Sequence, residues 1–392
     1  MTCLITHMFI NRKKAFYENK KFFLFSFLFF VLVNLGMTQS IPSLSLPNGA
    51  DIVAGKVQVE SLGNKMQINQ FSSKAAIRWN EFNVGKDASV EFFQPNPASS
   101  ILNQVSSEDP SFILGKVSSN GNVFITNGNG IFFGKNATVD VGGLVASTME
   151  IKIDDFINDD FSFKGSKNGG KIVNEGRISS STGGYVALLA SDVRNSGIVM
   201  AQKGTVALAS GKRVELRFAE KNNLEGVRVD ASDWDALVEN KHVIEAEEGL
   251  VILSANAKRT LRGGVVNNSG RITAQGILRK GGRIILTADE NGEVSNSGLV
   301  DASSKGGKGG IVTMEGRKLL IDSHSITDVS GKKGGGVFLA GGDWQGGKTP
   351  AEEPLLSSSQ MKEAVEVIMK GEALINASAG QNGDGGKVVL WS

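Results

Sequence analysis

The most informative polar residues of the sequence lie in one short segment, Asn127-Gly128-Asn129-Gly130. Amide side chains donate and accept hydrogen bonds but do not titrate, so this segment offers turn geometry and recognition rather than acid–base chemistry. Asparagine and glycine also favour tight turns, because both tolerate backbone conformations that other residues avoid. We therefore predict that Asn127, Asn129 and Gly130 shape a tight turn. Whether they also take part in recognition stays open.

Patterns typical of catalysis or metal binding are missing from the sequence. After residue 40 the chain has two histidines, His242 and His324, which do not stand at metal-ligand spacing, and no cysteine. No Gly-x-Ser-x-Gly motif is present, and the glycines around residue 130 lack the spacing and the following helix of a phosphate loop. We predict no catalytic residue, no metal site and no cofactor.

Short apolar runs on both sides of the asparagine segment predict strands. Val123-Phe124-Ile125 precedes it, Ile131-Phe132-Phe133 follows it, and Val139-Asp140-Val141 comes after the next corner. Strands of this length, at this pace, are typical of the coils of a parallel β-helix. A composition of 49 glycines and only 7 prolines suits many short strands joined by tight turns. The net charge of only +2 gives no electrostatic reason to expect a nucleic-acid partner.

A repeated pattern supports the same fold from about residue 166 onward. Glycine pairs that precede apolar strands begin at Gly169, Gly183, Gly281, Gly309, Gly335 and Gly385. Asparagine turns lie between them, at Asn174, Asn195, Asn268 and Asn296. A single coil is too small to bury its own apolar face, so coils must stack, and stacked asparagines can form ladders. We predict an all-β fold, a right-handed parallel β-helix with small extra-helical elements. A β-sandwich, whose strands need no recurring sequence, is the alternative.

The two ends of the chain carry further signals. A basic region followed by an apolar run over residues 22–33 predicts a signal peptide, residues 1–40, cleaved after Ser40. An uncleaved anchor is the alternative. The only cysteine, Cys3, lies in this segment. Near the other end, the apolar residues between Met361 and Met369 recur at helical spacing and predict a short helical insertion near residues 359–370.

Three blocks resemble one family, the secretion domain of two-partner secreted, filamentous haemagglutinin-like exoproteins. Residues 77–105 look like the family's tryptophan-containing strand and its Leu-Asn-Arg-Val element, present here as Leu102-Asn103-Gln104-Val105 with glutamine in place of the arginine. Residues 113–148 resemble the central block, whose Asn-Pro-Asn-Gly turn appears at 127–130 without its proline. Residues 183–218 and 267–392 resemble the β-helical repeats of the passenger region.

The resemblance implies a route and a domain plan. It implies a secretion domain over residues 41–165, with an alternative end near residue 300, followed by β-helical passenger repeats over 166–392. It implies that the partner is an outer-membrane β-barrel transporter with periplasmic receptor domains. It also implies that Asn127, Asn129, Gly130 and Asn103 take part in recognition by this transporter; the alternative is that the residues at 127 and 129 only shape a turn. The expected product is a secreted or surface adhesin, with a receptor on a host or neighbouring cell as a further partner. A secreted carbohydrate-active β-helix enzyme and a truncated remnant of a larger exoprotein are the alternatives.

Overall fold

The computed structural model describes residues 41–219, 223–258, 263–277, 281–344 and 361–392. The chain divides into two compact units, Met1–Pro42 and Ser43–Ser392, and the second contains all the strands of the described residues. The predicted signal peptide and its cleavage site at Ser40 lie outside the described residues. Within the described part of the chain, no helix is both long and apolar enough to span a bilayer.

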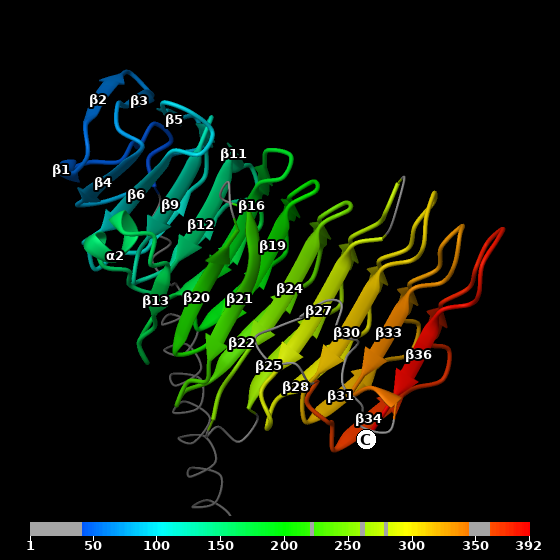
Figure 1. Cartoon of the computed structure of the whole chain (residues 1–392). Coiled ribbons are helices and arrows are strands. Elements are labelled where there is room, and N and C mark those ends of the chain that lie inside the picture. The colour runs from blue at the N-terminus through cyan, green and yellow to red at the C-terminus, as the bar shows by residue number, and fades with distance from the viewer. Residues whose placement is uncertain (1–40, 220–222, 259–262, 278–280, 345–360) are drawn as a thin grey trace, which may run out of the picture. The chain divides into compact units, whose positions relative to one another are not determined.

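Three long sheets run the length of this unit, and each regular coil gives one strand to each of them (Figure 1). Sheet 1, in spatial order, contains β1 (Asp51–Ala54), β4 (Lys74–Trp79), β6 (Ser100–Val105), β9 (Asn122–Thr126), β12 (Gly143–Ser147), β16 (Tyr185–Leu189), β19 (Thr205–Ser210), β24 (Leu250–Ala255), β27 (Arg283–Ala288), β30 (Ile311–Glu315), β33 (Val337–Ala340) and β36 (Lys387–Leu390). Sheet 2 contains β7 (Ser111–Ile113), β10 (Ile131–Phe133), β14 (Lys171–Asn174), β17 (Asp192–Asn195), β22 (Ala236–Asn240), β25 (Gly264–Asn268), β28 (Glu293–Asn296), β31 (Lys318–Ile321) and β34 (Glu366–Met369). Sheet 3 contains β2 (Val57–Leu62), β3 (Lys65–Gln70), β5 (Ser89–Phe93), β8 (Lys116–Ser119), β11 (Thr138–Val141), β15 (Arg177–Ser180), β18 (Ile198–Met200), β23 (Val243–Glu245), β26 (Arg271–Thr273), β29 (Leu299–Asp301), β32 (Ile326–Asp328) and β35 (Leu374–Asn376).

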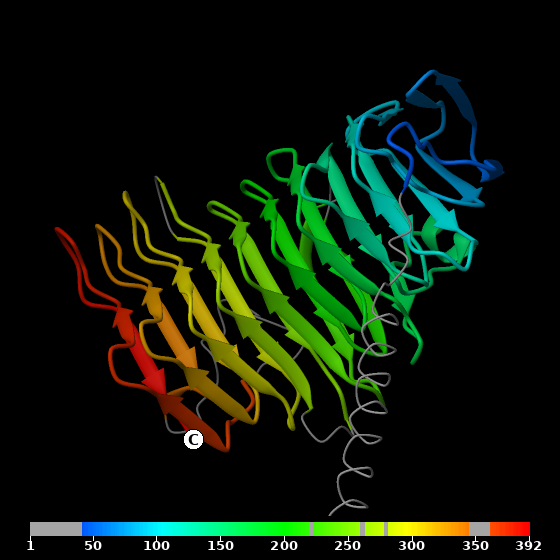
Figure 2. The same cartoon turned by 180° about the vertical axis from the view of Figure 1, so that it is seen from behind.

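Coil stacks on coil in parallel register, and the view from behind shows the same succession (Figure 2). In sheet 2 one inward row runs through Ile172, Val193, Val238, Val266 and Val294, and all of these side chains are buried. Burying this row removes apolar surface from water at every step along the axis, which is the main term that holds the coils together. The predicted all-β, parallel β-helix fold class with small extra-helical elements is confirmed.

The N-terminal end departs from parallel pairing. β1 pairs antiparallel with β4, and β2 and β3 form an antiparallel hairpin that continues into sheet 3. From β3 and β4 onward, every neighbouring pair in the three sheets is parallel. The regular winding of the chain therefore begins only after this first, hairpin-containing segment.

A small extra-helical layer packs on the outer face of sheet 1. The antiparallel strands β13 (Ser162–Lys164), β20 (Arg213–Phe218) and β21 (Leu224–Asp230), with the short helix α2 (Ile153–Ile157), form this layer. All of these elements are inserted at the corner where the chain leaves sheet 1 for sheet 2. Their side chains enclose a second apolar cluster, in which Phe124 stacks on Phe161 with ring centroids 5.6 Å apart. Full burial in this cluster raises the pKa of Tyr185.

A column of glycines accounts for five of the six predicted glycine pairs, those that precede strands of sheet 1. A Cβ atom placed on Gly204 would lie 1.9 Å from the carbonyl oxygen of Gly184, one coil earlier. The same close approach, at 2.0–2.2 Å, recurs at Gly184, Gly249, Gly282, Gly310, Gly336 and Gly386. Only a residue without a Cβ atom allows backbone to approach backbone this closely. The corner from sheet 3 to sheet 1 is therefore restricted to glycine in successive coils.

The helix predicted near residues 359–370 is wrong in the described part of that segment. Residues 359 and 360 lie outside the described residues, and from Glu366 to Met369 the chain forms strand β34. This strand pairs in parallel with β31, with Leu319 opposite Val367. Val365, Ile368 and Met369 are exposed, so their helical spacing does not mark a buried helix face. The ladder offered by the preceding coil outweighs the local pattern.

Candidate functional site

The asparagine turn joins β9 to β10, and Asn127 organises it. The Oδ1 atom of Asn127 accepts a hydrogen bond from the backbone N–H of Asn129 at 2.9 Å, which is an Asx turn. Its Nδ2 atom donates to the carbonyl of Asp109 at 3.0 Å and to Ser111 Oγ at 2.9 Å. Because Asn127 is only 1% exposed, its amide is consumed in fixing the turn to the preceding loop.

Asn129 and Gly130 complete the same turn, with Asn129 exposed and Gly130 buried. The Nδ2 atom of Asn129 donates to the carbonyl of Ser107 at 2.7 Å. Gly130 has a φ of 130°, and a Cβ atom there would lie 3.2 Å from the carbonyl oxygen of Lys171 on the following coil. Glycine is therefore required at 130 by conformation as well as by space. The structure thus places Asn127, Asn129 and Gly130 in one corner, in which the side chain of Asn129 is exposed.

Asn103 lies apart from this corner, inside the β-helix. It stands on β6 in register with Ile125, and it is fully buried. Its Oδ1 atom accepts the indole N–H of Trp79 at 3.0 Å, and its Nδ2 atom donates to the carbonyl of Phe124 at 3.1 Å. A buried amide that connects three successive strands of sheet 1 satisfies polar groups of the core. In the folded unit its side chain does not reach the asparagine turn.

The asparagines of the repeats form one continuous buried ladder at the corner after sheet 2. Each Nδ2 atom donates to the Oδ1 atom of the asparagine on the next coil, and every one of these distances is 2.8 Å. The members, in order, are Asn174, Asn195, Asn240, Asn268 and Asn296. The ladder ends at Asn296, because Ile321 follows it in register, and the buried Nδ2 atom of Asn296 has no hydrogen-bond partner within the described part of the chain.

Sequence reasoning missed two parts of this arrangement. Asn240 belongs to the ladder but is followed by Lys241 and His242 rather than by serine and glycine, so the turn motif does not mark it. The loop that holds the asparagine turn, with Ser107 and Asp109, carries no motif that would have assigned it this task. A strand alignment by apolar register would have identified Asn240, because Val238 aligns with Val193.

The described residues contain no group of three or more His, Cys, Asp or Glu side chains placed to hold a metal ion. The polar chemistry of the turn and of the ladder is therefore that of neutral amides and backbone groups. Such groups can shape a corner, fix the register of coils and offer hydrogen bonds to another chain.

This chain is similar in sequence to one protein family and to two known proteins. Residues 39–302 match the sequence profile of the TPS secretion domain, where TPS stands for two-partner secretion. A Heme/hemopexin-binding protein of Haemophilus influenzae is 30% identical over 255 residues, which cover 62% of this chain and 27% of that protein. A second Heme/hemopexin-binding protein of the same species is 29% identical over 313 residues, covering 73% of this chain and 32% of the relative. The chain thus spans about a third or less of the curated relatives that it matches.

A solved structure gives the corresponding comparison in three dimensions. The HMW1 secretion domain from Haemophilus influenzae matches with a TM-score of 0.73 and 27% sequence identity, covering 85% of this chain and 84% of that chain. The matched profile extends from residue 39 through strand β29, and therefore contains the asparagine turn, the extra-helical layer and the entire asparagine ladder. This chain belongs to the TPS secretion domain family.

Proposed function

We propose that this chain directs the export of a secreted, adhesin-like exoprotein through an outer-membrane β-barrel transporter with periplasmic receptor domains. In this proposal the signal peptide, residues 1–40, is removed after Ser40, and the unfolded chain is recognised in the periplasm. The observation that carries the proposal is the match of residues 39–302 to the TPS secretion domain. We propose residues 41–165, or a segment reaching to about 300, as the recognition region and residues 166–392 as passenger repeats.

Coil-by-coil stacking supplies a physical reason for outward transport. Each coil contacts mainly its neighbours, so a coil that has emerged can stack on the previous one without waiting for the rest of the chain. Burial of the inward apolar row and completion of one ladder bond stabilise each added coil. A folded coil is too wide to return through a pore that passes an extended chain. Folding outside would therefore bias movement in one direction.

We assign different tasks to the residues of the site. Asn127 fixes the geometry of the turn, since its amide is buried and fully bonded. Asn129 and Gly130 are proposed for recognition by the transporter while the chain is unfolded, because Asn129 stays exposed after folding and its side chain is therefore not required by the buried core. Asn103 is proposed to contribute to recognition only in the unfolded chain, because folding buries it. Recognition of an extended segment by strand addition to a sheet edge of the transporter would suit Asn103, Asn129 and Gly130.

The activity of the exported protein is a separate proposal. We propose a binding protein without catalytic activity, secreted or held at the cell surface, whose receptor lies on a host or neighbouring cell. The relatives are named for binding heme or hemopexin, but this chain covers about a third of them or less. We therefore do not extend heme or hemopexin binding to it. A carbohydrate-active enzyme and a truncated remnant of a longer protein are the rival interpretations.

The test is fractionation of the native cells with and without a candidate transporter. We expect the protein in the medium or at the surface when the transporter is present, and periplasmic degradation when it is deleted. Unchanged release without any transporter would overturn the export proposal. Cleavage of acidic polysaccharides by the purified protein would instead support the enzymatic rival.

Two single variants separate recognition from folding. Asn127→Ala removes buried bonds and is expected to lower both the unfolding midpoint and export. Asn129→Ala removes one exposed bond, so we expect a nearly unchanged unfolding midpoint with reduced export. If Asn129→Ala is exported like the parent protein, its assignment to recognition is wrong and the turn has only a structural task.

A further inference from the structure

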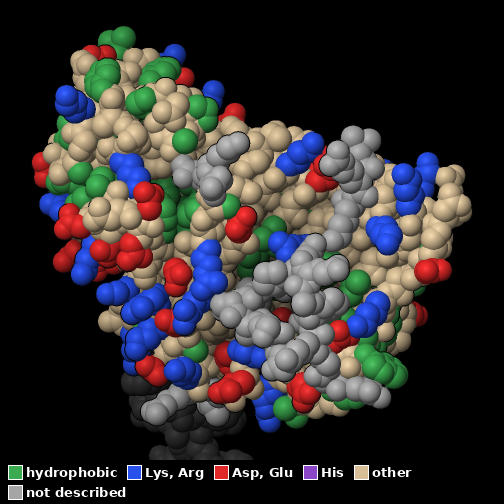
Figure 3. Space-filling model, in the orientation of Figure 1, with side chains coloured by type: hydrophobic (Ala, Val, Ile, Leu, Met, Phe, Trp, Pro, Cys, Tyr) green, Lys and Arg blue, Asp and Glu red, His purple; other side chains and the backbone are tan. Residues whose placement is uncertain are grey.

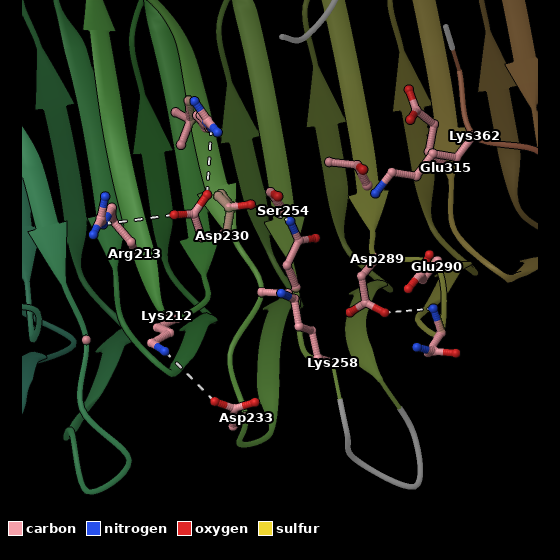
Figure 4. Close-up of a pocket in the computed structure, with 18 of the residues that line it drawn as sticks. Lys212, Arg213, Asp230, Asp233, Ser254, Lys258, Asp289, Glu290, Glu315 and Lys362 are labelled. Atoms are coloured by element: carbon pink, nitrogen blue, oxygen red, sulfur yellow. Dashed lines mark hydrogen bonds and ion pairs between the residues drawn. The ribbon is translucent and has the colours of Figure 1, made fainter. Parts of the chain in front are cut away.

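A polar cavity of about 750 Å³ lies beside the extra-helical layer and is distinct from the asparagine turn (Figure 4). One wall is formed by residues of β20 and β21 and by the loop that follows them, including Arg213, Asp230 and Asp233. The floor is formed by sheet 1, where β24, β27 and β30 contribute Ser254, Thr287 and Glu315. A cavity of this volume is in the range that accommodates small organic ligands.

The floor changes character where the extra-helical layer ends. One outward register position of sheet 1 runs through Leu189, Ala209, Ser254, Thr287 and Glu315 on successive strands. Its first two members, Leu189 and Ala209, belong to the apolar cluster beneath the extra-helical layer. Its last three line the cavity and carry hydroxyl or carboxyl groups. The strands are about 4.8 Å apart, so these three polar groups repeat at that interval along the rod axis.

The wall presents loosely paired cations. The Nζ atom of Lys212 lies 3.9 Å from Oδ2 of Asp233, and the Nε atom of Arg213 lies 3.9 Å from Oδ2 of Asp230. Both distances are at the outer limit for ion pairs. The two basic side chains are 59% and 51% exposed. Exposed pairs of this kind stabilise a fold little, so their cations can exchange partners at small cost. Figure 3 shows Lys and Arg side chains gathered with acidic ones over this part of the surface.

The hydrogen-bond acceptors of the floor differ in how many hydrogen bonds they already accept within the fold. Asp289 is fully engaged, because its carboxylate accepts backbone N–H groups from Ala257, Gly264 and Asn291. The Nδ2 atom of Asn256 donates to the carbonyl of Val229, but its Oδ1 atom is buried and has no hydrogen-bond donor among the described residues. A buried acceptor without a donor costs free energy that a ligand hydroxyl could recover.

We propose that this cavity binds a short carboxylated oligosaccharide, with the ligand carboxylate on the Lys212–Arg213 wall and its hydroxyls on the floor. The ligand must supply an anion on one side and several hydroxyl donors on the other. Hydroxyl groups on successive sugar rings match the row of Ser254, Thr287 and Glu315. An acidic peptide would satisfy the wall but bring few donors to the floor. Binding, without bond cleavage, is the activity proposed, and it does not depend on the route of export.

The test is titration calorimetry of the purified exported chain with three probes of similar length. The probes are a hexamer of galacturonate, a neutral hexamer of glucose and a hexamer of glutamate. We expect measurable binding of the galacturonate hexamer and at least tenfold weaker binding of the other two. Equal binding of the glucose hexamer would overturn the assignment of the wall, and equal binding of the glutamate hexamer would overturn that of the floor. Binding of none of the three would overturn the site.

Two substitutions and one matched control locate the site. Lys212→Ala is expected to weaken galacturonate binding about tenfold, and Thr287→Val about fivefold, as expected for one charged and one neutral hydrogen bond. Lys171→Ala removes another exposed, ion-paired lysine from the outer face of sheet 2 and is expected to leave binding unchanged. Circular dichroism spectra that match those of the parent protein would show that the variants fold. Equal affinities for all four proteins would place the ligand elsewhere, and an unsaturated or shortened product would contradict binding without cleavage.

Discussion

Replacing Asn240 by alanine cuts the asparagine ladder in its middle. Asn240 accepts a hydrogen bond from Asn195 and donates one to Asn268, both at 2.8 Å. After the substitution, the Nδ2 atom of Asn195 keeps the carbonyl of Val243 at 3.2 Å, so it retains one acceptor. The Oδ1 atom of Asn268 loses its donor from the preceding coil. The substitution therefore removes two ladder hydrogen bonds and leaves the Oδ1 atom of Asn268 without its donor, in a fully buried corner.

The free energies of these losses can be added roughly. Each hydrogen bond contributes about 1 kcal/mol net, and a buried group left without a partner costs about 1–3 kcal/mol. Asn240→Ala should therefore lower the free energy of unfolding by about 3–5 kcal/mol. At the end of the ladder the expectation is smaller. Asn296→Ala removes one ladder bond and the bond from the Gly298 N–H, but it also removes a buried donor that lacks a partner among the described residues, so a net loss of about 1 kcal/mol is expected.

Equilibrium unfolding in urea, followed by circular dichroism and checked by refolding, measures both differences. Asn267→Ala is the matched control, because Asn267 is the neighbour of Asn268 on β25 but lies at the partly exposed surface, where its Oδ1 atom accepts a hydrogen bond from Ser295 Oγ. We expect the control to change stability by less than about 1 kcal/mol. If Asn240→Ala and the control are equally destabilising, or if Asn296→Ala costs as much as Asn240→Ala, the ladder bonds do not make the expected contribution to the free energy of unfolding.

Three further predictions follow from other parts of the fold. Asn103→Ala deprives the Trp79 indole N–H of its acceptor and should lower the unfolding free energy by about 2–4 kcal/mol, and an unchanged urea midpoint would contradict this. Gly204→Ala places a Cβ atom 1.9 Å from the Gly184 carbonyl oxygen and should abolish the protease-resistant product. Gly226→Ala, whose Cβ atom meets nothing within 4 Å, should leave that product intact. Burial raises the pKa of the Glu315 carboxyl above its ordinary value of 4.5, so its contribution to stability is greatest below that pH and is lost as the pH rises through the folded-state value. The melting temperature should fall with rising pH over this range, and Glu315→Gln should flatten the slope; equal slopes would show that Glu315 does not cause it.

Local sequence predicts the coils well, because the same features recur from coil to coil. These features are the short apolar strands, the glycine at one corner and the asparagine of the ladder at another. The strands expected around residues 123–125, 131–133 and 139–141 are found as β9, β10 and β11, with small differences at their ends. Glycine pairs and asparagines are also visible in sequence, since a close backbone approach and a buried amide ladder restrict residue type strongly. Such restrictions do not depend on what lies far away in the chain.

The failures arise where the partner of a segment is distant in sequence. The edge strand β34 has an apolar pattern that suits a helix, and only its pairing with β31 decides for a strand. The extra-helical layer depends on β20 finding both β13 and β21, and nothing in the residues of β20 names those partners. Asn103 was associated with recognition through a motif, while its partners Trp79 and Phe124 lie on neighbouring coils. Whether these asparagines are recognised by a transporter stays a prediction.

The glycine column bears on how such a chain can diverge and grow. The obstacle at each of these corners is a backbone carbonyl of the previous coil, so no compensating change of a neighbouring side chain can make room for a larger residue. Divergence is therefore free to accumulate on the outward faces while one position per coil stays fixed. Duplication or loss of a complete coil leaves the column unbroken, whereas a gain or loss of a few residues at the corner would misalign it. Lineages of this architecture should consequently change length in whole coils.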